Sequence, residues 1–257
     1  MESKKTPSIT IYRGFLDSGC YVWSPFVVKL ELRLRIGRLN YRTEPGSVTK
    51  APRGKIPYLS IERANGVETL SDSTLIAKSL VESGDLGELN KKLSPTEKLN
   101  DLALIALLED KLYFCNSNEK WIHNYYTMRS KVLAAVPWPL QLLVGYMVYN
   151  KMVRTLQGQG TGKFTDEEIE SLCKNIYEAL NGHVTNAQVL NREKEGPFWL
   201  WGDSPSEADT VLFGFLAGTL VCDAAPASQK MIKSYPALME YARRIHYAYF
   251  PDYPIWG

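Results

Sequence analysis

Segments with the residue pattern of β-strands occur only in the first third of this 257-residue chain. After Gly87 we find no convincing strand, and the signals for helices are strong. A small mixed sheet with helices packed on it must therefore come first, followed by a helical bundle. We predict two domains, residues 1–88 and 89–257. The predicted strands are Ser8–Tyr12, Leu39–Thr43, Ile56–Ile61 and Val67–Leu70.

The segment between the first two predicted strands contains conflicting signals. Val28–Ile36 alternates apolar and polar residues, which is typical of a strand. However, Ser24-Pro25 supplies an N-cap with proline at the first helical position, and Gly37 supplies a C-terminal cap. Most residues between them are leucine, lysine, arginine and glutamate, which favour helices. We therefore predict a helix that begins at Ser24 and ends at Gly37.

The rest of the first domain shows turn and cap signals. Glu44–Lys55 contains two prolines and two glycines, so we predict a loop there. Asn65-Gly66 predicts a hairpin turn between the third and fourth strands. Ser71–Thr74 opens a second helix. The residues themselves thus predict the order β-α-β-loop-β-β-α.

Three helices of the second domain begin with capping boxes, in which a hydroxyl residue precedes an acid by three positions. One of them continues into Val211–Val221, which is almost wholly apolar. We expect this helix to lie at the centre of the bundle, buried on all sides. The boxes are Ser94–Glu97, Thr165–Glu168 and Ser206–Asp209.

Charge and composition exclude several functions. The net charge of +2 indicates neither an acidic nor a basic partner, so we expect no nucleic acid. The three histidines lie far apart without metal-ligand spacing, and we predict no metal. The four cysteines include no C-x-x-C and indicate reduced thiols in a cytoplasmic protein.

The chain offers no clear membrane-targeting signal. Met1–Pro7 is polar, and no apolar signal-peptide core follows it. Val132–Val148 is the most membrane-like stretch, but two prolines interrupt it and it is shorter than the roughly 20 apolar residues of a spanning helix. We predict an amphipathic core helix here and no transmembrane segment.

The order of these segments, with a proline entering the third strand, resembles the cytosolic glutathione transferase superfamily. The resemblance implies a thioredoxin-like first domain, in the order β-α-β-α-β-β-α, followed by an all-α helical bundle. The motifs that carry it are Ser24-Pro25-Phe26, Lys55-Ile56-Pro57, Asp72-Ser73 and the Ser206–Asp209 box. Further motifs resemble the metaxin-like, failed-axon-connections branch: Gln159–Lys163 before Asp166–Glu168, Pro205–Asp209 and Tyr249–Tyr253.

This resemblance implies that glutathione binds as a co-substrate in the cleft of the first domain. Ser24 would be the catalytic residue, whose hydroxyl donates to the glutathione sulfur and favours the thiolate. Pro57 would be cis, leaving the backbone of Ile56 free to pair with the cysteinyl part of the ligand as an added strand does. The glutathione-binding residues implied are Phe26, Lys55, Ile56, Pro57, Asp72 and Ser73, with Asp72 facing the ammonium, Ser73 the γ-glutamyl carboxylate and Lys55 the glycyl carboxylate.

Several of these residues also have a purely structural interpretation. Ser24 can act only as the N-cap of its helix, which stabilises a helix by about 1 kcal/mol. Lys55 can be a solvated loop lysine, and Asp72 and Ser73 can be ordinary cap residues. Cys20, in the loop before Ser24, is a further candidate for a reactive thiol.

Aromatic residues suggest a pocket for a hydrophobic electrophile. The candidates are Tyr12, Trp23, Trp121, Tyr125, Tyr126 and Trp138, although aromatic residues at such spacing more often belong to the core. Four arginines between positions 33 and 42 resemble a basic strip, which we interpret as a solvated helix face.

The leading functional hypothesis is a glutathione S-transferase-like enzyme that adds the glutathione thiolate to a hydrophobic electrophile, for example in a specialised-metabolite step. The alternative is a non-catalytic, metaxin-like protein that uses the same fold for binding or assembly. A homodimer is compatible with either hypothesis.

Overall fold

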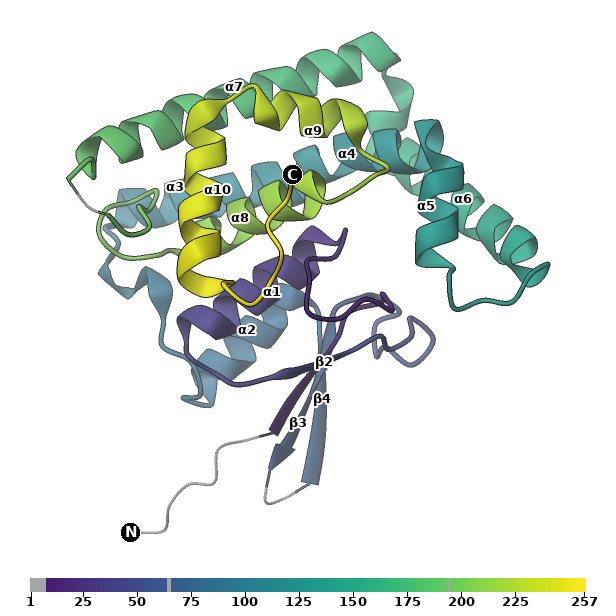
Figure 1. Ribbon diagram of the computed structural model, residues 1–257, viewed down its shortest axis with the longest axis horizontal. Coiled ribbons are helices and arrows are strands. Elements are labelled where there is room, and N and C mark those ends of the chain that lie inside the picture. Colours follow the sequence, from purple (N-terminus) through teal and green to yellow (C-terminus); the bar gives the residue numbers. More distant parts are fainter. Residues whose placement is uncertain (1–7, 64–65, 194) are drawn as a thin grey trace.

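The structure is a computed structural model that describes residues 8–63, 66–193 and 195–257. Figure 1 shows a small sheet at one end of the molecule and a larger helical region at the other. Two helices, α1 (Pro25–Ile36) and α2 (Ser73–Glu82), lie between them. The strands have the spatial order β2-β1-β3-β4, with β1 parallel to β2 and the other neighbouring pairs antiparallel. This confirms the predicted mixed sheet. The strands are β1 (Ser8–Tyr12), β2 (Arg42–Glu44), β3 (Tyr58–Arg63) and β4 (Gly66–Ser71).

The second strand begins later than the sequence predicted. Arg38 adopts a left-handed backbone, with φ of 55°, and the Leu39 N–H donates to the Leu34 carbonyl at 3.0 Å. The residues that follow Gly37 therefore finish the preceding helix, and strand pairing starts only at Arg42. The predicted hairpin turn includes Asn65, which lies outside the described residues, while Gly66 pairs with Arg63 at the end of the hairpin.

The connection between β2 and β3 contains turns and no helix within residues 45–57. This agrees with the loop indicated by its prolines and glycines, rather than with the extra helix of the family order. The segment packs against the sheet at Gly46, whose φ is 65°. A Cβ added there would lie 2.5 Å from the Cβ of Tyr12, so the close approach requires glycine.

The helical region comprises residues from about 89 onward, as predicted, although the boundary at residue 88 itself stays a prediction. All three predicted capping boxes are formed, and α8 is buried from Ala208 to Leu220. Short 3₁₀ segments, Leu89–Lys92 and Thr161–Lys163, and π-helical segments, Leu107–Leu112 and Glu119–His123, join the longer helices. Its α-helices are α3 (Pro95–Ala106), α4 (Tyr113–Asn118), α5 (Tyr125–Val132), α6 (Leu140–Gln159), α7 (Asp166–Leu190), α8 (Glu207–Leu220), α9 (Pro226–Lys233) and α10 (Pro236–Tyr249).

Two further α-helices, α1 (Pro25–Ile36) and α2 (Ser73–Glu82), pack on the same face of the sheet. The helix prediction for α1 is thus correct despite its alternating sequence. Residues four apart share a side of a helix, whereas residues two apart lie on nearly opposite sides. Val28 and Leu32 pack in the core of the helical region, and Leu30 and Leu34 pack in the core of the sheet region.

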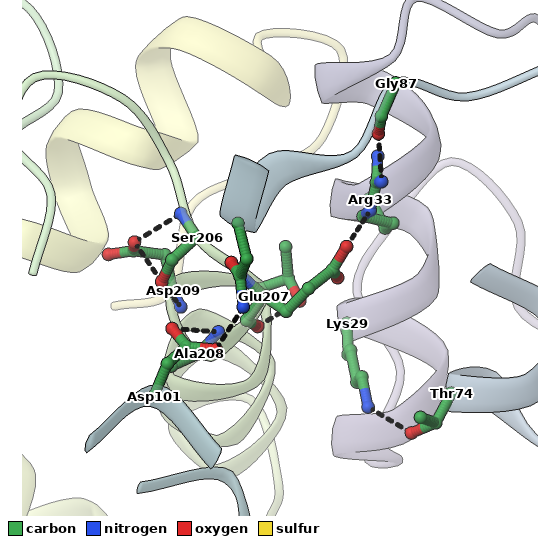
Figure 2. Close-up of polar contacts among 11 residues, drawn as sticks. Lys29, Arg33, Thr74, Gly87, Asp101, Ser206, Glu207, Ala208 and Asp209 are labelled. Atoms are coloured by element: carbon green, nitrogen blue, oxygen red, sulfur yellow. Dashed lines mark hydrogen bonds and ion pairs between the residues drawn. The ribbon is translucent and has the colours of Figure 1, made fainter. Parts of the chain in front are cut away.

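The polar residues of α1 occupy its two remaining sides. Lys29 and Arg33 lie on one side, and Arg33 Nε donates to Glu207 Oε1 at 2.8 Å (Figure 2). Glu31 and Arg35 lie on the other, where Arg35 pairs with Asp252 near the C-terminus. The prediction of a solvated arginine face was therefore wrong for Arg33, which is buried, and for the paired Arg35. Arg33 and Arg35 thus pair with residues of α8 and of the C-terminal segment, whereas Arg38 and Arg42 are exposed.

α1 and α8 form the closest contact between the two regions. Gly214 of α8 lies directly against the first turn of α1, so that a Cβ added there would be 2.5 Å from the Pro25 carbonyl oxygen. Gly218, one turn later, faces Pro25 at slightly greater distances. Two glycines four residues apart thus allow the two backbones to approach and fix the position of the α1 N-terminus.

Candidate functional site

The N-terminus of α1 carries a hydroxyl that its own helix does not use. Ser24 is the N-cap, with an extended backbone, and it is half-buried. Its side chain makes no capping hydrogen bond. The other serine and threonine N-caps of the described α-helices, Ser94, Thr165 and Ser206, each accept a hydrogen bond from the backbone three residues on. The Ser24 hydroxyl therefore remains available at the positive end of a helix dipole, where an anion is stabilised.

The Lys55–Pro57 segment packs beside the loop between β1 and α1. The Ile56–Pro57 peptide bond is cis, as the resemblance implies. Ile56 packs on the cluster that contains Trp23, and its Cγ1 lies 3.0 Å from the Cβ position of Gly14. Among the described residues, neither the backbone N–H nor the C=O of Ile56 has a hydrogen-bond partner. Lys55 is exposed, whereas Pro57 is buried.

Asp72 and Ser73 lie at the same end of the sheet as Pro57, because Tyr58 pairs with Ser71. Asp72 Oδ1 accepts hydrogen bonds from the backbone N–H groups of Thr74 and Leu75, so Asp72 is the N-cap of α2. Its φ of 77° is uncommon for a residue with a Cβ, and such outliers cluster at ligand sites. The predicted binding residues of the two segments are thus brought together.

A buried ion pair connects this end of the sheet to the helical region. Lys29 Nζ donates to Thr74 Oγ1 at 2.8 Å, as Figure 2 shows, and to Glu109 Oε1 at 2.7 Å. Lys29 is 4% exposed, and a lysine so buried requires a partner. The sequence analysis did not identify Lys29 or Glu109. The available signal was the four-residue spacing of Lys29 and Arg33, which places both on one side of α1.

The aromatic residues predicted to line a substrate pocket do not gather around one open site. Trp23 and Trp121 are 6% and 8% exposed and belong to one buried cluster, with Tyr125 packed against it. Tyr12 lies elsewhere and stacks on Tyr58, with ring centroids 4.3 Å apart. The positions of Trp23, Trp121 and Tyr125 favour the alternative interpretation, in which they form core, whereas Tyr126 and Trp138 are exposed.

Phe26 also packs within the protein. Its ring makes edge contacts with Tyr113 and Phe215, at centroid distances of 5.1 and 6.1 Å. Phe26 therefore faces the helical region, and its predicted contact with glutathione stays a prediction.

The described cysteines are free thiols. Burial raises the pKa of Cys20, which makes the thiolate form less available and argues against a reactive thiol at this position. Across the described ranges, no three histidine, cysteine, aspartate or glutamate side chains gather in a way that could hold a metal ion. None of the helices in the described part of the chain is long and apolar enough to cross a membrane.

Two cavities lie away from Ser24. One, of about 650 Å³, is bounded by the end of α1, the start of β2 and the C-terminal residues 248–253. The other, of about 480 Å³, lies along α6. None of the predicted site residues lines either cavity.

Comparison with known proteins identifies the class of fold. The glutathione S-transferase N-terminal domain family matches residues 25–128. Glutathione transferase GSTFuA3 from Phanerochaete chrysosporium superposes with a TM-score of 0.61 at 13% identity, covering 95% of this chain and 97% of that one. A glutathione S-transferase from Rhodospirillum rubrum F11 gives 0.51 at 16% identity, covering 93% and 87%. The chain has the glutathione transferase fold, with a thioredoxin-like domain followed by a helical domain.

The amino-acid sequence is also similar to those of metaxin-2 proteins. Human metaxin-2 is 23% identical over 211 residues, which are 79% of this chain and 72% of the relative. A metaxin-2 homolog from Caenorhabditis elegans is 24% identical over 194 residues, 74% and 76% of the two chains. The chain is thus similar in sequence to metaxin-2 proteins and has the fold of glutathione transferases, in agreement with the motifs that resemble both groups.

Proposed function

We propose that this chain binds glutathione in its thioredoxin-like domain and that Ser24 activates the thiol for addition to a hydrophobic electrophile. The observation that carries the proposal is the Ser24 hydroxyl, which its helix leaves unused. The proposal places this reaction in the cytoplasm, in keeping with the free thiols of the described cysteines.

The proposed ligand contacts follow the polar groups at the end of the sheet. The unpaired backbone of Ile56 offers one donor and one acceptor, which suits the cysteinyl unit of an extended peptide. Ser73 and the N-terminus of α2 suit the γ-glutamyl carboxylate, and Asp72 suits the ammonium. The exposed Lys55 is assigned to the glycyl carboxylate.

Thiol activation requires only a modest effect. A free thiol has a pKa of about 8.5, so a decrease of about two units leaves it mostly ionised near pH 7. The dipole of α1 contributes about 0.3–1 kcal/mol in this direction, and a hydrogen bond from Ser24 to the sulfur adds to it. The thiolate then forms a bond to the electrophilic carbon, and the electrophile's leaving group departs or its π-electrons shift to accept a proton.

A thermal-denaturation experiment tests binding without assuming catalysis. Glutathione at about 100 times its Kd should stabilise the fold by roughly 2.7 kcal/mol, and S-methylglutathione should act similarly because it keeps the peptide contacts. No shift with either compound would exclude the proposed site. Asp72→Asn should weaken both ligands, whereas Glu178→Gln, at an exposed position on α7, should change neither.

A kinetic experiment then tests activation. The Ser24→Ala variant should bind S-methylglutathione as well as the parent chain does, but it should conjugate a model electrophile about 10-fold more slowly or worse. Ser94→Ala is the matched control, since Ser94 is also a helix N-cap but uses its hydroxyl in a capping box. If Ser24→Ala retained the full rate, Ser24 would not be the activating residue.

A second candidate function is non-catalytic binding or assembly. The buried positions of Trp23 and Trp121 favour it, because these side chains pack in the core instead of lining a pocket for an electrophile. Similarity to metaxin-2 favours it as well. Stabilisation by glutathione without turnover of any electrophile would support a binding role, whereas turnover that depends on Ser24 would support the enzyme.

A further inference from the structure

The outer face of the α5–α6 hairpin exposes an unusual number of apolar side chains. We call this face the hairpin surface. It lies at the edge of the helical region, where α5 and α6 project to one side of the molecule (Figure 1). Its residues, each between 44% and 66% exposed, are Trp138, Leu140, Leu142, Leu143, Tyr146 and Met147.

These side chains are not needed to hold the hairpin together. The opposite side of α6 packs on α5 through Gly145, where an added Cβ would lie 2.6 Å from Tyr125 Oη and from Arg129 Cδ. Leu156 on the same inner side is also buried. The exposed Leu140, Leu143 and Met147 follow helical spacing along the outer side. An apolar patch of this kind on the outside of a well-packed hairpin indicates an interaction site.

The charged residues beside the hairpin surface indicate that its partner carries negative charge. Residues 125–163 contain five lysines and arginines and no aspartate or glutamate. Lys151 and Arg154 continue the same side of α6 beyond the apolar residues, and with Tyr146 and Met147 they line the cavity of about 480 Å³. Within the described ranges, neither Lys151 nor Arg154 has an ion-pair partner.

We infer that the hairpin surface docks on a bilayer that contains anionic phospholipids. Trp138 and the apolar end of α6 insert at the interface, while Lys151 and Arg154 contact headgroup phosphates. Tryptophan and tyrosine favour the membrane interface, and an amphipathic helix with basic residues beside its apolar face lies in the interface plane. A second copy of this chain fits less well, because pairing two hairpin surfaces would bring their unpaired cations together.

Vesicle co-sedimentation with the full chain tests this inference. The chain should bind phosphatidylcholine vesicles that contain phosphatidylserine and should bind pure phosphatidylcholine only weakly. The double variant Lys151→Glu with Arg154→Glu should lose at least about 30-fold in affinity, since each basic residue near an anionic surface contributes about 1 kcal/mol. The control is Lys174→Glu, on the exposed side of α7, which should change affinity little.

The apolar contribution is tested separately. Leu143→Asp should reduce vesicle binding by at least about tenfold, whereas Leu190→Asp should not, although Leu190 is 85% exposed. Emission from Trp138 should shift to shorter wavelength with anionic vesicles, and Trp138→Phe should abolish the shift. Circular dichroism of each variant verifies that it is folded.

Three results would overturn the inference. They are absence of sedimentation with anionic vesicles, equal binding of the Leu143→Asp variant, and equal binding to neutral and anionic vesicles. Dimerisation that Leu143→Asp abolishes, without vesicle binding, would assign the hairpin surface to a second copy of the chain. None of these results depends on glutathione binding, so this test and that of the proposed function can fail independently.

Discussion

The N-termini of α8 and α1 both begin with a serine N-cap, yet they differ in what surrounds the hydroxyl. Ser206 is fully buried and donates to Asp209 Oδ2 at 2.9 Å, while its oxygen also accepts from the Asp209 N–H. Ser24 is half-buried and has no capping hydrogen bond. The polar groups at α8 thus satisfy one another, whereas those at α1 leave a donor for a partner from outside the chain.

The hydrogen bonds of Asp209 explain why the polar groups at the N-terminus of α8 need no partner from outside the chain. Its carboxylate accepts hydrogen bonds from the Leu200 N–H, from the Ser206 N–H and hydroxyl, and from the Tyr241 hydroxyl. A buried carboxylate with its acceptor positions filled in this way has a structural role. The contrast teaches that a serine-acid capping box and a lone serine before proline predict different functions, although both are N-caps.

The largest expected effect is that of removing the Asp209 carboxylate. Asp209→Ala should lower the free energy of unfolding by on the order of 3–5 kcal/mol, because several buried donors lose their acceptor together. Urea denaturation measures the change. Asp223→Ala, at an exposed position, serves as control and should change stability by less than about 0.5 kcal/mol. If Asp209→Ala lowered the free energy of unfolding by less than about 1 kcal/mol, the buried donors at the N-terminus of α8 would not depend on the Asp209 carboxylate.

The pH dependence of stability sharpens the same comparison. Burial raises the pKa of Asp209 to about 6, whereas an unfolded aspartate has a pKa of about 3.9. Between these values the unfolded state loses its proton while the folded state retains it, so the folded state binds more protons and stability falls as pH rises. The contribution of this group is complete below about pH 4 and is lost as pH rises through 6, by up to about 3 kcal/mol.

Urea denaturation of the parent chain and of Asp209→Asn between pH 4 and 7 measures this contribution. The parent should lose more stability than the variant over that range, because asparagine does not titrate. Parallel curves for the two proteins would show that Asp209 has an ordinary pKa and that its hydrogen bonds compensate for burial.

The effect of close packing is expected to be somewhat smaller. Gly214→Ala should destabilise the fold by about 1–3 kcal/mol, because its Cβ would lie 2.5 Å from the Pro25 carbonyl oxygen and the helices must separate. Gly218→Ala, with a closest distance of 3.3 Å, should cost less. Equal effects at the two positions would indicate that α1 and α8 are less tightly packed than described. The comparison requires only denaturation curves.

The sequence predicted the elements of the fold because their signals are local. The three capping boxes and the apolar run of α8 each depend on residues within one helix. The polar sides of α1 could not be interpreted in this way. Whether Lys29 or Arg33 faces water depends on Glu109 and Glu207, which are distant in the sequence.

The candidate site was likewise predictable where its signals are local and not where it depends on contacts between distant segments. Ser24, Pro57 and Asp72 stand in motifs, and the structure brings Pro57 and Asp72 to one end of the sheet. The predicted aromatic pocket depended on how the loop before α1 packs against residues near 121–125. That contact is non-local, and it buries Trp23 and Trp121 in one cluster.

The smallest expected change in stability separates the two N-caps most directly. Ser206→Ala should cost about 1–2 kcal/mol, since it removes a satisfied cap and leaves buried groups without a partner. Ser24→Ala should cost less than about 0.5 kcal/mol, because no capping hydrogen bond is lost. If Ser24→Ala proved as destabilising as Ser206→Ala, the Ser24 hydroxyl would be a structural cap in solution. It would then not be free to meet a thiol, and the activating role proposed for it would fail.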